Sequence, residues 1–173
     1  MTIDPEHFHF SVEPLGKNHN RTAFSSGSQP LDAYFRTQAR QDVEKRVAAT
    51  FVLRDTETDR IAGFYSLSST AVPLDKFPPE VAKKLPKYPP VPATLLARLA
   101  IDSAYRGQGL GEFLLLHALE KSLEHSQEVA STAVIVDAKD EAARSFYLKH
   151  RFLELPDQPM RFFLPMKTVE KLF

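Results

Sequence analysis

The sequence predicts an α/β (α+β) protein with a mixed, twisted central sheet flanked by helices. Two neighbouring stretches, 48–55 and 60–70, have strand-like composition and are joined by a short polar turn, as in an antiparallel hairpin. Residues 93–150 follow the order strand, helix, strand, helix, which is typical of parallel neighbours. The chain has 173 residues, 43% of them hydrophobic and 25% charged. This composition predicts one globular domain over 1–173 with its own core.

The first third of the chain begins with a predicted strand at 8–15, where apolar and polar residues alternate. A helix is expected within 25–48. Ser28 is its candidate N-cap, and Pro30 sits in the first turn, where the lack of an amide hydrogen costs nothing. An apolar stripe with helical spacing supports this helix, and it consists of Leu31, Tyr34, Phe35 and Ala39. The hairpin at 48–70 follows.

The second half of the chain begins after a proline-rich stretch. Residues 73–92 hold seven of the thirteen prolines, so they predict a structured surface loop with a short helix at 78–85. A strand is then expected at 93–102, a helix at about 110–126, a buried strand at 132–138 and a helix at 140–150. Two final strands are expected at 152–156 and 160–166. The predicted order is β-α-β-β-loop-β-α-β-α-β-β.

Bulk composition excludes several classes of protein. No run of 18 apolar residues is present, so no membrane span is expected, and the first ten residues do not resemble a signal peptide. The chain has no cysteine, which excludes disulfides and thiol nucleophiles and suits a cytoplasmic location. The formal net charge is zero, so overall charge does not indicate a nucleic-acid binder.

The most informative stretch is "YRGQGLGEFLLLHAL" at 105–119. Three of the six glycines, Gly107, Gly109 and Gly111, fall within five residues between a predicted strand and a predicted helix. Backbone amides in such a turn can converge on one point, and the helix N-terminus adds free amides and a positive dipole end. The sequence therefore predicts an anion site suited to phosphate. A glycine-rich turn without a ligand is the alternative.

Three phosphate-binding motifs compete for this turn. The Walker A motif fails because no Lys-Ser or Lys-Thr pair follows Gly111. The dinucleotide fingerprint fits poorly, since the spacing is G-x-G-x-G and the motif lies past the middle of the chain. The third pattern, Arg/Gln-x-x-Gly-x-Gly/Ala, is matched by Arg106, Gly109 and Gly111. It is the pyrophosphate loop of acyl-CoA-dependent N-acetyltransferases of the GNAT superfamily, which this chain resembles.

Further segments carry the same resemblance. The strand "LARLAID" precedes the turn, and "AVIVDA" matches the strand that splays away from it in such enzymes. A later A-x-x-F/Y-Y-x-x-x-G-F pattern is matched by Ala143, Phe146, Tyr147 and Phe152. Two departures concern the ends of the 140–150 helix: Arg151 replaces the usual C-terminal glycine, and Asp140 replaces Asn near the start. Asp caps a helix equally well, whereas a left-handed cap at His150 or Arg151 has an energetic cost.

A narrower resemblance concerns GNAT toxins of bacterial toxin–antitoxin pairs. An F-x-x-G-x-x-x-L-D block (Phe24, Gly27, Leu31, Asp32), the approach "YPPVPATLLARLAID" and the end "VEKLF" are similar to that branch. The resemblance implies acetylation of the α-amino group of aminoacyl-tRNA. It also implies acetyl-CoA as cofactor, a ribbon-helix-helix antitoxin as partner, DNA contact only through that antitoxin, and a homodimer. The alternatives are a GNAT enzyme acting on a small amine or a protein N-terminus, and a non-enzymatic binding module.

The resemblance also implies site residues. Tyr147 is the candidate proton donor to the departing thiolate, or else a core aromatic, and backbone amides of Leu99–Ile101 are candidates for stabilising the oxyanion. The general base is not assigned. Asp137 is a weak candidate for that role and is more consistent with a structural residue. The residues expected to bind the cofactor are Leu99, Ala100, Ile101, Arg106, Gly107, Gln108, Gly109, Leu110, Gly111, Glu112, Asp137 and Ser145.

Basic residues form candidate contacts with RNA, although charged helix faces are commonly only solvated. They are Arg36, Arg40, Lys45, Arg46, Lys83, Lys84, Lys87 and Arg98. Three roles are open for Arg98: it could bind an RNA phosphate, line the acceptor channel or form a salt bridge on the face of the sheet. His7 and His9 are two residues apart without an evident third ligand, so no metal site is predicted, and His117 is expected to pack in the core.

Overall fold

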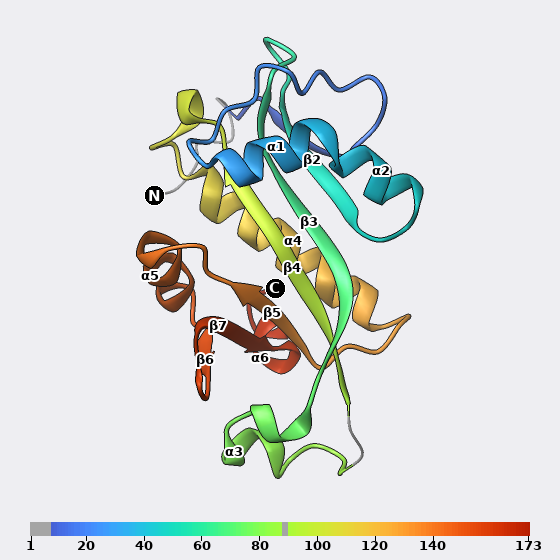
Figure 1. Ribbon diagram of the computed structural model, residues 1–173, viewed down its shortest axis with the longest axis vertical. Coiled ribbons are helices and arrows are strands. Elements are labelled where there is room, and N and C mark those ends of the chain that lie inside the picture. The colour runs from blue at the N-terminus through green and yellow to red at the C-terminus, as the bar shows by residue number, and fades with distance from the viewer. Residues whose placement is uncertain (1–7, 88–89) are drawn as a thin grey trace. The chain divides into compact units, whose positions relative to one another are not determined.

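A computed structural model describes residues 8–87 and 90–173 of the chain. Figure 1 shows β3 and β4 as the two long strands of a mixed seven-stranded sheet. The elements in chain order are β1 (Phe10–Pro14), α1 (Gln29–Thr37), α2 (Ala39–Glu44), β2 (Ala49–Asp55), β3 (Ile61–Val72), η2 (Leu74–Lys76), α3 (Pro79–Ala82), β4 (Val91–Ile101), η3 (Ser103–Tyr105), α4 (Leu110–Ser126), β5 (Ala133–Asp137), α5 (Glu141–Lys149), β6 (Leu153–Leu155), β7 (Gln158–Pro165) and α6 (Met166–Glu170). The predicted α/β class is confirmed, and all seven predicted strands are present in the predicted order.

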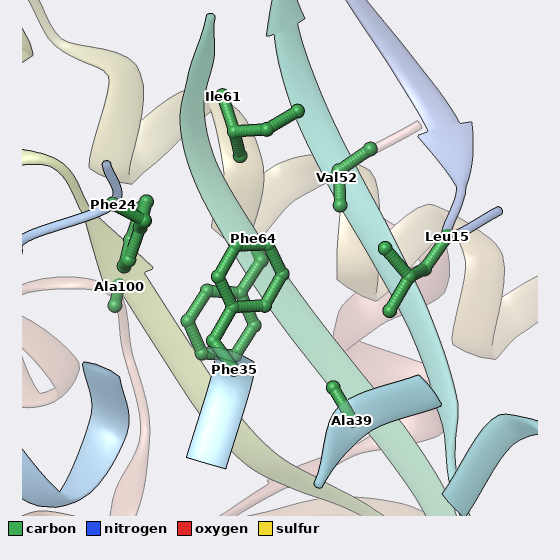
Figure 2. Close-up of a cluster of buried hydrophobic side chains, with 8 residues drawn as sticks. All are labelled: Leu15, Phe24, Phe35, Ala39, Val52, Ile61, Phe64 and Ala100. Atoms are coloured by element: carbon green, nitrogen blue, oxygen red, sulfur yellow. The ribbon is translucent and has the colours of Figure 1, made fainter. Parts of the chain in front are cut away.

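Contacts divide the chain into two compact units. The first contains the chain up to Ser68 together with Arg98–Ala118, and its strands follow the order β1-β2-β3-β4. β2 pairs antiparallel with both β1 and β3, as the hairpin prediction requires. The core of this unit consists of Leu15, Phe24, Phe35, Ala39, Val52, Ile61, Phe64 and Ala100 (Figure 2). Phe35 of α1 stacks on Phe64 of β3 with ring centroids 4.3 Å apart, which fixes α1 on the sheet.

The second unit contains Ser69–Ala97 and Leu119–Phe173, with strands in the order β3-β4-β5-β7-β6. β4 and β5 are parallel, and their ladder covers Thr94–Leu96, whereas β4 continues to Ile101. The last ladder pair, Leu96 with Val136, lies one residue before the end of β5 at Asp137, so β4 continues beyond the pairing. The core of the unit consists of Val72, Phe77, Val91, Ala93, Ala133, Ile135, Leu155 and Phe163.

The structure differs from the sequence prediction in three elements. The single helix expected within 25–48 is divided into α1 and α2 at Gln38, whose φ of −116° departs from helical geometry. The bend accompanies a hydrogen bond of 2.8 Å from the Tyr34 hydroxyl to Asp42. β4 begins at Val91, within the stretch expected as a proline-rich loop, and α6 was not predicted. Ser28 occupies the N-cap position of α1 without a side-chain capping bond.

Both ends of α5 agree with the sequence prediction. The Asp140 carboxylate accepts a hydrogen bond of 2.8 Å from the Ala143 amide, as an N-cap does. Arg151 adopts the left-handed conformation with φ of 71°, so the residue that replaces glycine carries the strain of this cap. No helix within the described ranges is both long and apolar enough to cross a bilayer.

Candidate active site

The glycine-rich turn lies between η3 and the start of α4, within the first unit. Gly107 and Gly109 have φ of +80° and +76°, a conformation that side chains with a Cβ rarely adopt. A Cβ added at either glycine would meet no atom within 4 Å, so the turn faces open space. In the described part of the chain, the amides of residues 107–109 donate no hydrogen bond. These amides, with the N-terminus of α4 beside them, can bind an anion such as phosphate.

The strand that leads into this turn supplies a second row of backbone groups. Ala100 is buried in the core of the first unit, while Leu99 and Ile101, its neighbours along β4, are only partly buried. The β4–β5 ladder ends at Leu96, so it does not reach the predicted cofactor residues Leu99–Ile101. Their backbone is therefore not paired with β5, whose last residue is Asp137.

The Arg106 side chain is engaged by the protein itself. Its guanidinium donates a hydrogen bond to the backbone carbonyl of Ser26, in the segment that precedes α1. Because the guanidinium is engaged in this contact, the backbone of Arg106 is the group that remains for the cofactor contact that the motif predicted. The remaining predicted residues of the turn lie at the start of α4: Leu110 is buried, Gly111 is partly buried and Glu112 is exposed.

Tyr147 lies in α5, in the second unit. It is only 7% exposed, and its ring contacts Phe146 and Phe152 at centroid distances of 5.4 Å each. Its hydroxyl makes no hydrogen bond with any described residue. Burial, reinforced by the negative charge of Asp137, raises the pKa of Tyr147 to about 12. The hydroxyl therefore stays protonated at neutral pH and is available as a donor to a ligand.

Two other predicted residues lie in the same unit as Tyr147. Asp137, at the end of β5, forms an ion pair of 3.3 Å with Arg161 of β7, in agreement with a structural role. Ser145 is an exposed residue of α5. The geometry of these two residues identifies no general base.

The candidate RNA contacts differ in how many protein contacts they already make. Arg36 donates to the carbonyl of Phe24, and Arg40 forms an ion pair of 2.7 Å with Glu44 in the next helical turn. The guanidinium of Arg98 lies 3.4 Å from the centroid of the Tyr34 ring and makes no hydrogen bond or ion pair with the described residues. The salt bridge considered for Arg98 is therefore replaced by a cation–π contact that leaves its donors unused. Lys83, Lys84 and Lys87 are exposed in the second unit.

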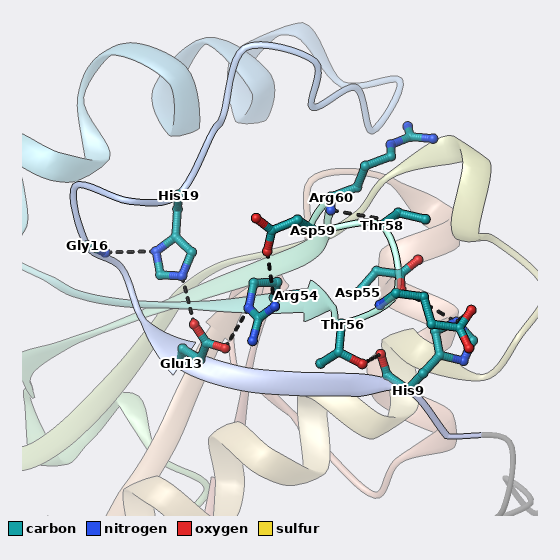
Figure 3. Close-up of polar contacts among 11 residues, drawn as sticks. His9, Glu13, Gly16, His19, Arg54, Asp55, Thr56, Thr58, Asp59 and Arg60 are labelled. Carbon is teal, nitrogen blue, oxygen red and sulfur yellow. Dashed lines mark hydrogen bonds and ion pairs between the residues drawn. The ribbon is translucent and has the colours of Figure 1, made fainter.

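Two histidines, His9 and His19, make polar contacts that the sequence did not reveal (Figure 3). His9 lies 3.6 Å from Asp55 and 3.8 Å from Glu57, a cluster compatible with a metal ligand set. However, the Asp55 carboxylate already accepts hydrogen bonds from the Tyr105 hydroxyl at 2.7 Å and the Glu57 amide at 3.0 Å. We therefore assign no metal to this cluster. His7 falls outside the described residues.

His117 belongs to an aromatic cluster of the first unit. Its Nδ1 lies 2.8 Å from the hydroxyl of fully buried Tyr65, and the Tyr65 ring stacks on Phe51 at 5.1 Å. The packing role predicted for His117 is confirmed, with an added hydrogen bond.

The family follows from a comparison with known proteins. Residues 17–152 match the acetyltransferase (GNAT) family, and this range includes the glycine-rich turn and Tyr147. The chain belongs to the GNAT family of acetyltransferases. The family that the turn predicted is confirmed.

One curated relative of this acetyltransferase is similar over most of its length. It is the tRNA-acetylating toxin of Mycobacterium tuberculosis (strain ATCC 25618 / H37Rv), which is 36% identical over 152 residues, 87% of this chain and 89% of the relative. The toxin branch that the sequence predicted is thus present among its relatives.

Solved structures show the same fold. A tyrosine-to-phenylalanine mutant of KacT has a TM-score of 0.90 at 27% identity, covering 96% of this chain and 100% of that chain. AtaT complexed with acetyl-methionyl-tRNAfMet has a TM-score of 0.87 at 27% identity, covering 95% and 99%. AtaTR bound with AcCoA has a TM-score of 0.84 at 25% identity, covering 95% and 98%. The predicted GNAT fold is confirmed.

Proposed function

We propose that this acetyltransferase transfers the acetyl group of acetyl-CoA to the α-amino group of aminoacyl-tRNA and thereby blocks translation. The observation that carries the proposal is the turn at Gly107–Gly109, where unused amides face open space at the start of a helix. The name of the Mycobacterium tuberculosis relative and the tRNA complex of AtaT support the choice of acceptor.

The residues of the turn fit the diphosphate of coenzyme A. Amides from Arg106 to Glu112 would bind phosphate oxygens, because both positive-φ glycines leave room for a close approach. The backbone of Leu99–Ile101, beyond the β4–β5 ladder, would hold the pantetheine arm. Acetyl-CoA supplies an acetyl group that is activated as a thioester. Asp137 and Ser145 remain predicted contacts of the cofactor.

The reaction joins the amine nitrogen to the acetyl carbonyl carbon and breaks the carbon–sulfur bond, so one amine proton must finally reach the sulfur. Backbone amides of Leu99–Ile101 would stabilise the oxygen that becomes negatively charged. Tyr147 would donate a hydrogen bond, and then its proton, to the departing thiolate. A thiol pKa of about 8.5 lies below the Tyr147 pKa of about 12, so full transfer is uphill by roughly 5 kcal/mol. Binding of the substrates must therefore bring the pKa of Tyr147 and the pKa of the thiol closer together.

The acceptor amine needs little activation in this scheme. The α-amino group of an aminoacyl ester is less basic than an alkylamine, so a substantial fraction is neutral near pH 7, and we assign no general base. Arg98 is a proposed contact of the acceptor, since its guanidinium has no competing hydrogen bond within the described chain. Arg36, Arg40, Lys83, Lys84 and Lys87 remain proposed contacts of the RNA backbone.

The remaining parts of the proposal concern assembly. A ribbon-helix-helix antitoxin would neutralise the enzyme and mediate any contact with DNA, and the enzyme would act as a homodimer in the cytoplasm. These features rest on the resemblance of the F-x-x-G-x-x-x-L-D block and the chain end to GNAT toxins.

The direct test is incubation of the enzyme with acetyl-CoA and total charged tRNA, followed by mass analysis of the amino acids released from the ester. We expect a gain of one acetyl group on the α-amino nitrogen, and no gain with uncharged tRNA. Activity should fall steeply with salt if basic residues hold the RNA. Acetylation only of small amines or of protein N-termini would reject the tRNA proposal, and binding of acetyl-CoA without any transfer would indicate a binding module.

A further inference from the structure

We infer that Phe24–Asp32, the segment before and at the start of α1, positions the pyrophosphate turn and sets the affinity for the cofactor through Arg106. We call it the supporting segment. The inference rests on the proposed cofactor site and adds positioning residues outside it. All residues involved lie in the first unit.

The backbone amide and carbonyl of Ser25 join the supporting segment to the residues just after β4. The Ser25 amide donates to the buried Asp102 carboxylate at 3.0 Å, and the Ser103 amide donates to the Ser25 carbonyl at 2.8 Å. Asp102 also accepts from the Ala104 amide at 2.9 Å, as the N-cap of η3. One buried carboxylate thus holds both the supporting segment and the entry to the glycine-rich turn.

A second buried carboxylate fixes the next residue of the supporting segment. Both oxygens of Asp32 accept hydrogen bonds from the Ser26 amide, at 2.9 and 3.1 Å, and one also accepts from the Ser26 hydroxyl at 2.6 Å. Asp32 is 6% exposed and Ser26 is 3% exposed, so this contact is shielded from water. It holds the Ser26 carbonyl in one orientation, and that carbonyl is the acceptor for Arg106.

Gly27 completes the arrangement because it leaves room for the guanidinium. A Cβ at this position would lie 3.0 Å from Nη2 of Arg106, and the φ of Gly27 is +89°. A side chain here would be strained and would press on the arginine. Two residues of the F-x-x-G-x-x-x-L-D block, Gly27 and Asp32, therefore share one function: they hold Arg106, the residue immediately before Gly107.

The consequence is indirect control of the cofactor site. Gly107 and Gly109 have few intrinsic restraints, since glycine has access to a wide range of backbone angles. A fixed Arg106 anchors the start of this flexible turn, so that its amides converge before the cofactor arrives. Loss of the anchor would add an ordering cost to binding. Arg106 is a positioning residue in this account, and its guanidinium need not contact phosphate.

The test is a double-mutant cycle on the dissociation constant for coenzyme A, measured by calorimetry. Gly27→Ala, Asp32→Asn and Arg106→Ala should each weaken binding about tenfold. Gly27→Ala and Asp32→Asn should cause no further loss in the Arg106→Ala background. Gly16→Ala is the matched control outside the turn. Its Cβ would lie 2.9 Å from the side-chain oxygen of Asn18, which is the end of a flexible side chain, and 3.9 Å from Nδ1 of His19, which is an ordinary contact, so it should leave affinity unchanged. Melting curves establish that each variant is folded; Gly27→Ala keeps the test decisive if Asp32→Asn does not fold.

Two outcomes would overturn the inference and leave the proposed function intact. Additive losses in the cycle would show that Gly27 and Asp32 act independently of Arg106. Unchanged affinity in all three variants would show that the turn needs no support, provided that Gly109→Ala in the same assay still weakens binding. If Gly109→Ala also has no effect, the cofactor site itself is wrong, and the two failures are distinguishable.

Discussion

Replacement of Tyr147 by phenylalanine separates chemistry from stability. The Tyr147 hydroxyl has no hydrogen-bond partner in the described chain, so its removal should change the free energy of unfolding by less than about 0.5 kcal/mol. Loss of a general acid costs about 10²- to 10⁴-fold in rate, or about 3 to 5 kcal/mol in activation free energy. Tyr147→Phe should therefore fold and bind coenzyme A like the parent but transfer acetyl groups at most about one hundredth as fast.

Tyr105→Phe is the matched control. Its hydroxyl donates a hydrogen bond of 2.7 Å to Asp55, a carboxylate whose residue is 3% exposed. A hydrogen bond to a charged group contributes about 1.5 to 3 kcal/mol. At about 2 to 4 °C per kcal/mol for a protein of this size, the melting temperature should fall by roughly 3 to 12 °C. Acetyl transfer at a temperature where the variant is folded should persist.

Single-turnover measurements with a charged tRNA, together with thermal melts of both variants, provide the assay. Acetyl transfer by Tyr147→Phe at the parental rate would contradict the role of Tyr147 as proton donor. That role is equally contradicted if the loss of activity in Tyr147→Phe is accompanied by a loss of stability as large as that of Tyr105→Phe, since the hydroxyl would then be structural.

Two further predictions concern the turn and pH. Gly109→Ala should cost about 1 to 2 kcal/mol of stability because φ is +76°, and it should weaken coenzyme A binding at least tenfold in calorimetry, whereas Gly16→Ala should do neither. Burial acts to raise the pKa of Asp55, but hydrogen bonds from Tyr105 and the Glu57 amide bring it below its ordinary value. The resulting stabilisation is present above the unfolded-state pKa of about 4 and is lost as pH falls through the lower folded pKa. In urea unfolding, the free energy of unfolding should therefore differ most between the parent and Tyr105→Phe at pH 6, and the difference should become smaller below pH 4. A difference that does not change with pH would contradict this cause.

The sequence predicted the parts of the fold that depend on local pattern. The hairpin, α4 and α5 follow from alternation, apolar spacing and capping residues such as Asp140, and the structure has all of them. It did not predict the break at Gln38, because no proline or glycine marks it, and the accompanying Tyr34–Asp42 bond is a tertiary feature. α6 has only five residues and directly follows a strand, so it leaves little periodic signal.

Some features of the candidate site were likewise predictable from local sequence, and others required the tertiary structure. The turn at Gly107–Gly109 was evident because glycine spacing reports directly on backbone angles. The link from Ser25 to Asp102 spans 77 residues, and no local pattern indicates such a contact. The Phe24–Asp32 block was visible as a resemblance, but its contact with Arg106 required the structure. The cluster of His9, Asp55 and Glu57 was missed because its members come from two separate segments.

A crystal structure with coenzyme A tests the central claim most directly. We expect the diphosphate oxygens to accept hydrogen bonds from the amides of Gly107–Gly111, while the Arg106 guanidinium still donates to the Ser26 carbonyl. A diphosphate bound elsewhere, with these amides facing only solvent, would contradict that claim.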